Sequence, residues 1–143
     1  MKSVVIGAEE HERVELTVLG YERQATGEFY DDNWLSCEVR VQAGAFGGKY
    51  SASFLASELS QLHQSLECLY RNLKGSVRFE SMESQLELQF TCDSLGHIAV
   101  LGTAMDQAGI GNKLSFSVSF DQTFLQRLVQ ELRQVVQAYP VRT

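Results

Sequence analysis

The stretch that decides the fold is Leu114-Ser115-Phe116-Ser117-Val118-Ser119-Phe120, in which apolar and serine side chains alternate strictly. Successive side chains of a β-strand point to opposite faces of its sheet, so this segment puts an apolar face on a core and a serine face in water. Antiparallel sheets tolerate a wet face, whereas parallel sheets are covered on both sides. The segment therefore predicts an antiparallel sheet with one exposed face.

The same alternation recurs along the rest of the chain. It occupies residues 14–18, 35–41, 50–54, 77–79, 86–90 and 98–100. Gly44, Gly47 and Gly48 lie between two of these runs and suit a hairpin turn, and residues 81–84 read as a second short turn. Short links of this kind predict an antiparallel meander sheet of about seven to eight strands.

Two segments change to the helical period. Ser57 can cap the first, whose apolar stripe ends before Gly75, and Asp121 can cap the second, which Pro140 stops. The two stripes comprise Leu59, Leu62, Leu66, Leu69 and Leu73, and then Phe124, Leu125, Leu128, Leu132, Val135, Val136 and Tyr139. We expect a single α+β domain over residues 1–143, with the meander sheet packed against two amphipathic helices. The glycine-containing stretch at 102–112 is predicted to be a mobile loop.

The charge balance limits the classes of partner. Twelve basic residues are scattered among eighteen acidic ones, for a net charge of −6. Phosphate binding needs clustered Lys and Arg, so general nucleic-acid binding is not expected. An acidic surface suits a basic protein partner, although solubility alone is the simpler explanation of the charge.

Cysteine usage and hydropathy indicate the compartment. Cys37, Cys68 and Cys92 are odd in number, widely spaced and at apolar-looking positions, which predicts buried free thiols in a reducing compartment. The start of the chain has too short an apolar stretch for a signal peptide, and no segment has the length of a membrane span. We expect a cytoplasmic protein without a membrane partner.

Local motifs for catalysis are missing from the sequence. His11, His63 and His97 have no motif partner, and we expect them to be solvated or locally hydrogen-bonded. The glycines before Lys49 do not have the spacing of a phosphate loop. The sequence therefore predicts no enzyme, no cofactor and no metal centre.

The segment Asp31-Asp32-Asn33 has two possible roles. Its oxygen donors could hold a divalent cation, but Asp and Asn side chains more commonly bond nearby N–H groups and shape a turn, which we favour. The neighbouring aromatics Phe29, Tyr30 and Trp34 could anchor the core or a partner, and the core is the favoured reading.

Several segments together resemble the WapI family of immunity proteins. They are residues 18–22 (VLGYE), 29–35 (FYDDNWL), 57–59 (SEL) and 115–121 (SFSVSFD), followed by a helix that closes at Tyr139-Pro140. The resemblance implies a small cytoplasmic bacterial protein that binds and neutralises the C-terminal domain of a polymorphic toxin made by the same strain. Such toxins are commonly nucleases, and a basic toxin domain would complement this acidic chain.

Residues for that contact are expected on the outer surface. We predict Asp31, Asp32, Glu38, Glu87 and Asp106 as partner-binding residues, either on the wet sheet face or on the 102–112 loop. Two other functions stay open. A small-ligand-binding or structural module would show a deep apolar pocket between sheet and helices. An enzyme with a dispersed site would show a buried carboxylate or histidine with a strongly shifted pKa.

Overall fold

A computed structural model describes residues 1–9 and 12–143, and within these ranges the chain folds into eight strands and three helices. The strands are β1 (Lys2–Glu9), β2 (Glu12–Tyr21), β3 (Trp34–Ala43), β4 (Phe46–Leu55), β5 (Gly75–Glu80), β6 (Leu86–Cys92), β7 (His97–Met105) and β8 (Lys113–Asp121). The helices are α1 (Phe29–Asp32), α2 (Ala56–Asn72) and α3 (Gln122–Ala138). The α+β class, the antiparallel pairing and both long helices are confirmed.

The strands form two sheets, so the prediction of a single meander is wrong. Sheet A has the order β1-β2-β3-β4 and sheet B the order β5-β6-β7-β8, each of them antiparallel throughout. The two sheets are separated in the chain by α2, whose 17 residues span about 25 Å. Because this helix carries the chain away from β4, β5 starts a second layer and does not pair with β4.

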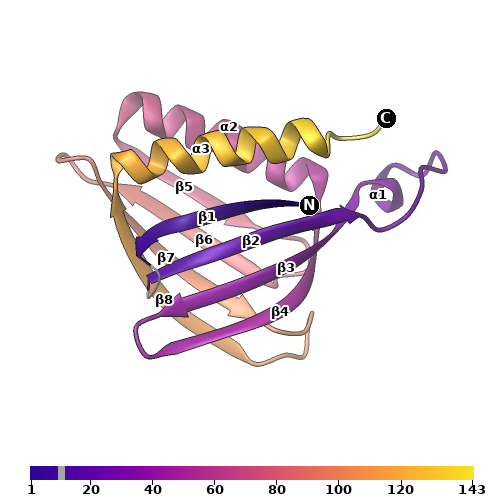
Figure 1. The fold of residues 1–143 in the computed structure, drawn as a ribbon, viewed down its shortest axis with the longest axis horizontal. Helices are drawn as coiled ribbons and strands as arrows, with labels where there is room; N and C mark the ends of the chain where they lie inside the picture. The colour runs from indigo at the N-terminus through magenta and orange to yellow at the C-terminus, as the bar shows by residue number, and fades with distance from the viewer. Residues whose placement is uncertain (10–11) are drawn as a thin grey trace.

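The two layers face each other across one core. Sheet A lies in front of sheet B in Figure 1, and α2 and α3 lie side by side along the top, close to β1 and β5. Buried side chains from both sheets and both long helices form one cluster, which includes Val39, Phe90, Leu66 and Leu128. The alternating side chains of each sheet therefore point either into this core or away from it, and the outer faces of sheets A and B point in opposite directions.

The helix ends differ in part from prediction. Ser57 is not the cap of α2, because Glu58 Oε1 accepts a hydrogen bond from Leu55 N (2.8 Å) and Leu55 is the N-cap residue. The helix ends at Asn72, its C-cap residue Leu73 adopts a left-handed conformation (φ 52°), and Gly75 begins β5. The predicted cap of α3 is confirmed, since Asp121 Oδ1 accepts from Thr123 N at 2.9 Å.

The edge of sheet A next to α3 is bonded by side chains of that helix. Val5 N in β1 donates to Glu131 Oε1 (2.9 Å), and Arg127 Nη2 donates to the carbonyl oxygen of Gly7 (2.6 Å). An edge strand presents unpaired N–H and C=O groups that can recruit a foreign strand. The two side chains of α3 occupy one N–H and one C=O group of this edge along β1.

Two further predictions are corrected by the structure. Cys37 and Cys92 are buried as expected, and burial raises the pKa of the Cys37 thiol to about 12, but Cys68 is exposed on α2. The stretch at 102–112 is not one loop, because β7 continues to Met105 and only residues 106–112 form the turn.

In the described part of the chain, no helix combines the length and apolar character that a bilayer crossing requires.

Candidate functional site

The segment between β2 and β3 projects beyond both sheets, at the right of Figure 1, and carries the one-turn helix α1. All ten residues from 22 to 31 are exposed. Helix α1 was not predicted, because four residues are too few to show a helical period. An exposed projection of this length needs specific contacts to hold one conformation.

Asp32 supplies the first set of those contacts. Its buried carboxylate accepts hydrogen bonds from Thr26 N (2.9 Å), Gly27 N (2.7 Å) and Thr26 Oγ1 (3.1 Å). Burial alone would raise the pKa of Asp32, but these donors and the nearby Arg23 guanidinium outweigh it and lower the pKa. Asp32 therefore shapes the turn, as the favoured prediction had it. No group of three or more His, Cys, Asp or Glu side chains within residues 1–9 and 12–143 is arranged to hold a metal ion.

Asn33 supplies the second set. Its buried side chain donates from Nδ2 to the carbonyl oxygens of Phe29 (2.7 Å) and Arg142 (2.9 Å), and its Oδ1 accepts from Arg142 N (2.7 Å). Its own carbonyl oxygen accepts from Ala56 N (2.8 Å), the first residue of α2. One amide side chain thus joins α1 to the segment that follows α3, and the backbone of the same residue joins both to α2.

Arg142 closes the arrangement. Its guanidinium donates to the carbonyl oxygens of Asp32 (2.9 Å) and Arg23 (2.8 Å), and lies 3.7 Å from the centroid of the Tyr21 ring. Tyr21 in turn packs edge-on against Tyr139 and donates its hydroxyl to the carbonyl oxygen of Pro140. Sequence reasoning missed Arg142, because a single arginine outside any motif gives no signal of a long-range contact.

Two aromatic side chains stand on the outside of this projection. Phe29 is 47% exposed and Tyr30 is 61% exposed, and their rings pack edge-to-face with centroids 5.4 Å apart. The prediction that these aromatics belong to the core is wrong for both. Trp34, at the start of β3, is partly buried.

The five predicted partner-binding residues do not form one surface. Asp31 is exposed on α1, with its carboxylate 3.6 Å from the Arg23 guanidinium, whereas Asp32 is buried. Glu38 lies on the outer face of sheet A and Glu87 on the outer face of sheet B. Asp106 follows β7 and accepts from Asn112 N (2.8 Å) in the β7–β8 turn. A partner of ordinary interface size cannot contact the outer faces of both sheets with one flat surface.

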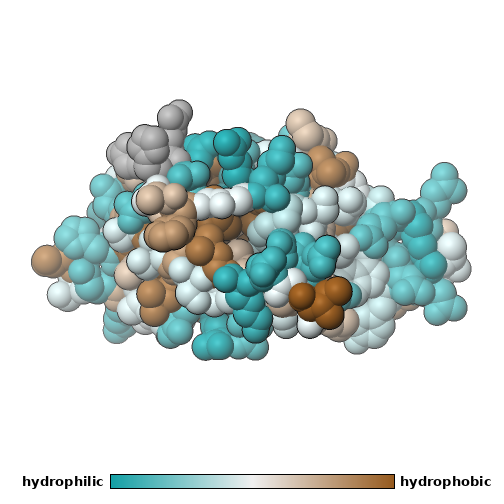
Figure 2. Space-filling view, turned by 90° about the horizontal axis from the view of Figure 1, so that it is seen from below, coloured by the Kyte–Doolittle hydropathy of each residue, from teal (hydrophilic) through white to brown (hydrophobic). Residues whose placement is uncertain are grey.

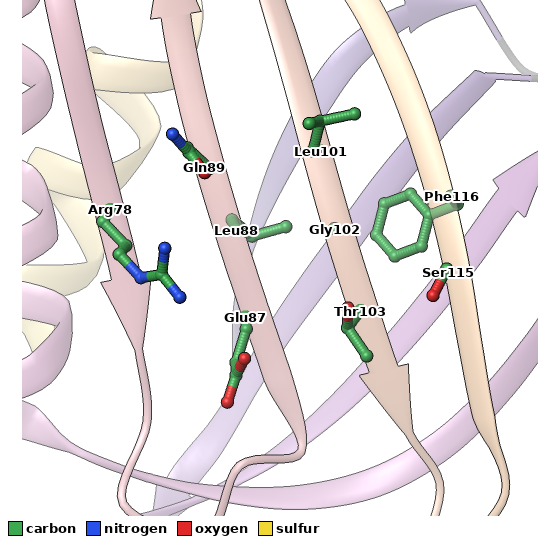
Figure 3. Close-up of a pocket in the computed structure, with 9 residues that line it drawn as sticks. All are labelled: Arg78, Glu87, Leu88, Gln89, Leu101, Gly102, Thr103, Ser115 and Phe116. Carbon is green, nitrogen blue, oxygen red and sulfur yellow. The ribbon is translucent and has the colours of Figure 1, made fainter.

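The outer face of sheet B carries a shallow hollow of about 320 Å³. Figure 3 shows its lining, in which Arg78 and Glu87 lie on neighbouring strands and Leu101 points away from the core. Leu101 is 62% exposed among polar neighbours. On the core side of the same strands, Figure 3 shows the Phe116 ring turned toward Gly102, where a Cβ atom would lie 2.2 Å from Phe116 Cζ.

A groove of about 260 Å³ separates β4 from the β7–β8 hairpin on the underside of the molecule. Figure 2, which views this side, shows brown apolar areas interrupted by pale and teal residues, with no continuous apolar face. The groove is lined by Val41, Phe46, Gly47, Gly48, Lys49, Tyr50, Ala104, Asp106, Asn112, Lys113 and Leu114. It is therefore part apolar and has two lysines on its walls.

His63 and His97 lie apart from these three places. The prediction of local hydrogen bonding is confirmed for His97, whose Nδ1 lies 3.3 Å from Asp93 Oδ2. It is wrong for His63, which is largely buried with its Nε2 3.8 Å from Glu67 Oε2 and no hydrogen bond to the described residues. His11 lies outside the described residues.

Comparison with known proteins gives one result for the whole chain. A search of curated proteins returns no match. The model of the immunity protein WapI-like family matches residues 5–140, a span that contains both long helices, the Asp32–Asn33 turn and both sheets except for the first three residues of β1. The earlier resemblance is thereby confirmed over nearly the full length, and the chain belongs to the WapI-like immunity protein family.

Proposed function

We propose that this protein neutralises a cognate polymorphic toxin by binding the toxin's C-terminal domain in the cytoplasm. The observation that carries the proposal is the family match over residues 5–140. An immunity role follows from that family, and we propose the toxin's C-terminal domain as the partner and the cytoplasm as the place of action. Residues 1–143 would act as one domain, which the single core cluster shared by both sheets and both long helices supports.

The cognate toxin domain is expected to be basic and to act as a nuclease. The net charge of −6 supports the first point, because complementary fields raise the rate of encounter and disfavour wrong partners. A nuclease needs a basic surface to hold its phosphate substrate. An acidic protein that covers this surface excludes the nucleic acid without chemistry of its own, so the inhibitor is proposed to be non-enzymatic.

A titration distinguishes binding from catalytic inactivation. The toxin domain encoded beside this chain in its own genome is mixed with increasing amounts of the protein, and the residual toxic activity is measured. Inhibition by binding ends at a fixed molar ratio, whereas an enzyme would abolish the activity at a small fraction of that ratio. A toxin domain from an unrelated system is the control and should stay active. Absence of a complex and of growth rescue with the cognate domain would contradict the proposal.

The ligand-binding alternative requires a deep apolar pocket between the sheets and the helices. In the described ranges, side chains from every layer occupy that space, among them Phe90, Leu66 and Leu128, each with no exposed surface. The hollow on sheet B and the groove beside β4 both open at the surface.

A further inference from the structure

We infer that the toxin domain docks on the exposed ridge of α1, formed by Glu28, Phe29, Tyr30 and Asp31 and called here the α1 ridge. This inference rests on the proposed function and names the surface that performs it. The partner is a protein domain with a basic surface that contains an apolar recess for an aromatic side chain.

The aromatic pair is the first observation. Phe29 and Tyr30 pack on each other at 5.4 Å and are exposed side by side on a projection, rather than scattered over the molecule. Aromatic side chains are enriched in protein interfaces and are frequent hot spots, because they bury a large area at little cost in rotamer freedom. The ridge thus offers two adjacent anchors to a partner.

The charge around the aromatics is the second observation. Residues 22–33 carry four carboxylates (Glu22, Glu28, Asp31 and Asp32) and the Arg23 guanidinium, and the Arg142 guanidinium lies against the same segment, so carboxylates exceed guanidiniums by two. Among these, Glu28 and Asp31 are exposed directly beside the aromatic pair, while the Asp32 carboxylate is turned inward. Carboxylates at the rim of an aromatic patch match a basic partner and slow the approach of an acidic one.

The rigidity of the ridge is the third observation. Hydrogen bonds accepted by the Asp32 carboxylate and donated by the Asn33 and Arg142 side chains hold the backbone on both sides of α1. Ordering a loop on association costs free energy, so a ridge that is already held in one conformation binds more tightly for the same contacts.

The groove beside β4 and the hollow on sheet B fit such a partner less well. The groove beside β4 presents Lys49 and Lys113, and the hollow on sheet B is lined by both Arg78 and Glu87, with the Arg78 guanidinium bonded to the Glu80 carboxylate. Neither place combines adjacent exposed aromatics with an excess of carboxylates. Both remain useful as comparison sites, because each has an exposed apolar side chain, Phe46 at the groove and Leu101 on sheet B.

Binding of single variants to the cognate toxin domain tests the ridge. The probe is the toxin domain encoded beside this chain, with its toxic activity removed by substitution, and Kd is measured by calorimetry or interferometry. Tyr30→Ala and Phe29→Ala are each expected to raise Kd by about 30-fold, the usual size of a hot-spot loss. Asp31→Lys is expected to lower kon and to weaken its dependence on salt.

Leu95→Ala is the matched control. Leu95 is 79% exposed in the β6–β7 turn, at the end of the molecule where α3 begins, and the 17 residues of α3 separate that end from α1 by about 25 Å. Its Kd is expected to equal that of the wild type. Circular dichroism and thermal unfolding are measured for each variant, and both are expected to match the wild type because the substituted side chains are exposed.

The possible binding results test the docking surface and the proposed immunity function separately. A wild-type complex that weakens with Tyr30→Ala and Phe29→Ala but not with Leu95→Ala supports the inference. If the wild-type protein binds the toxin domain, and Kd is unchanged by both ridge substitutions but raised by Phe46→Ser or Leu101→Ser, the ridge is not the docking surface. The immunity function then still stands. Failure of the wild type to bind any toxin domain overturns the proposed function, and the ridge with it.

Discussion

Asn33 and Arg142 lie 109 positions apart in the chain and are joined by two hydrogen bonds, from Asn33 Nδ2 to Arg142 O (2.9 Å) and from Arg142 N to Asn33 Oδ1 (2.7 Å). The asparagine side chain pairs with the backbone of Arg142 as a neighbouring strand residue would. A buried amide can do this because it presents one donor group and one acceptor on the same side chain. The pair ties the turn before β3 to the segment after α3.

Asn33→Asp should destabilise the protein, because a carboxylate has the same shape as the amide but no N–H to donate. The carbonyl oxygens of Phe29 and Arg142 would then face an acceptor. The free energy of unfolding is expected to fall by about 3 kcal/mol, as for other buried groups left without partners. Urea unfolding measures it, with Asn72→Asp on the exposed face of α2 as the control. A loss equal to that of the control would show that the pair is not structurally important.

The contribution of Asp32 to stability should depend on pH in one direction. Its folded-state pKa lies below the ordinary 3.8, so the ionised carboxylate stabilises the fold above that pH, and the contribution is lost as the pH falls through the lowered pKa. Wild type is expected to exceed Asp32→Asn in unfolding free energy by a constant amount near neutral pH, with the difference shrinking below about pH 3.8. Asp31→Asn, an exposed neighbour, is the control and should track the wild type. A difference that grows in acid would contradict the assignment.

Gly102→Ala should destabilise sheet B through a direct clash. The added Cβ would lie 2.2 Å from Phe116 Cζ, so the ring or the strand must move. Overpacking of this kind typically costs about 1–3 kcal/mol. Gly48→Ala on β4 is the matched control, because its Cβ would meet no atom within 4 Å. Adding Phe116→Leu to Gly102→Ala should restore part of the loss, and a double variant no better than the single one would refute the clash.

Leu128→Ala tests the packing of α3. Leu128 has no exposed surface and belongs to the cluster that both sheets share. Removing its side chain is expected to lower the unfolding free energy by about 2–5 kcal/mol. Gln130→Ala on the exposed side of the same helix should change it by less than about 0.5 kcal/mol. Near-equal effects of the two would mean that α3 presents another face to the core.

Glu38 and Glu87 should be reversed to Lys separately, because they lie on outer faces that point in opposite directions. Docking on the α1 ridge leaves both carboxylates outside the contact, so each change is expected to lower kon by about threefold or less at physiological salt. A much larger effect of one reversal alone would place the toxin on that sheet face. Association rates measured over a range of salt concentrations separate local contact from general steering.

Sequence periodicity was enough to predict seven of the eight strands and both long helices, whereas β1 and α1 were not predicted. The strict period of residues 114–120 and the Asp121 cap led to β8 and α3, and both are confirmed. The division into two sheets could not be read in the same way, because period 2 shows which side chains share a face but not which strands pair. Strand pairing across α2 depends on contacts between residues far apart in the chain.

The candidate site was harder to predict than the fold. Asp32 and Asn33 stood out as a turn, but their partner Arg142 is a single arginine with no pattern around it. The exposure of Phe29 and Tyr30 was missed because aromatic side chains are usually buried, and α1 is too short to show which face is covered. A long-range hydrogen bond leaves no mark on local periodicity, so only the folded geometry reveals that the turn is held from outside.

The bonds between α3 and β1 have a consequence for synthesis. Val5 and Glu131 are 126 positions apart. At ribosomal speeds of about 5–20 residues per second, Glu131 is therefore added to the chain roughly 6 to 25 s after Val5. During that interval the nascent chain presents an open strand, and a chain cut short before α3 would present it permanently. Coverage of the β1 edge is therefore completed late in translation, when α3 packs beside it.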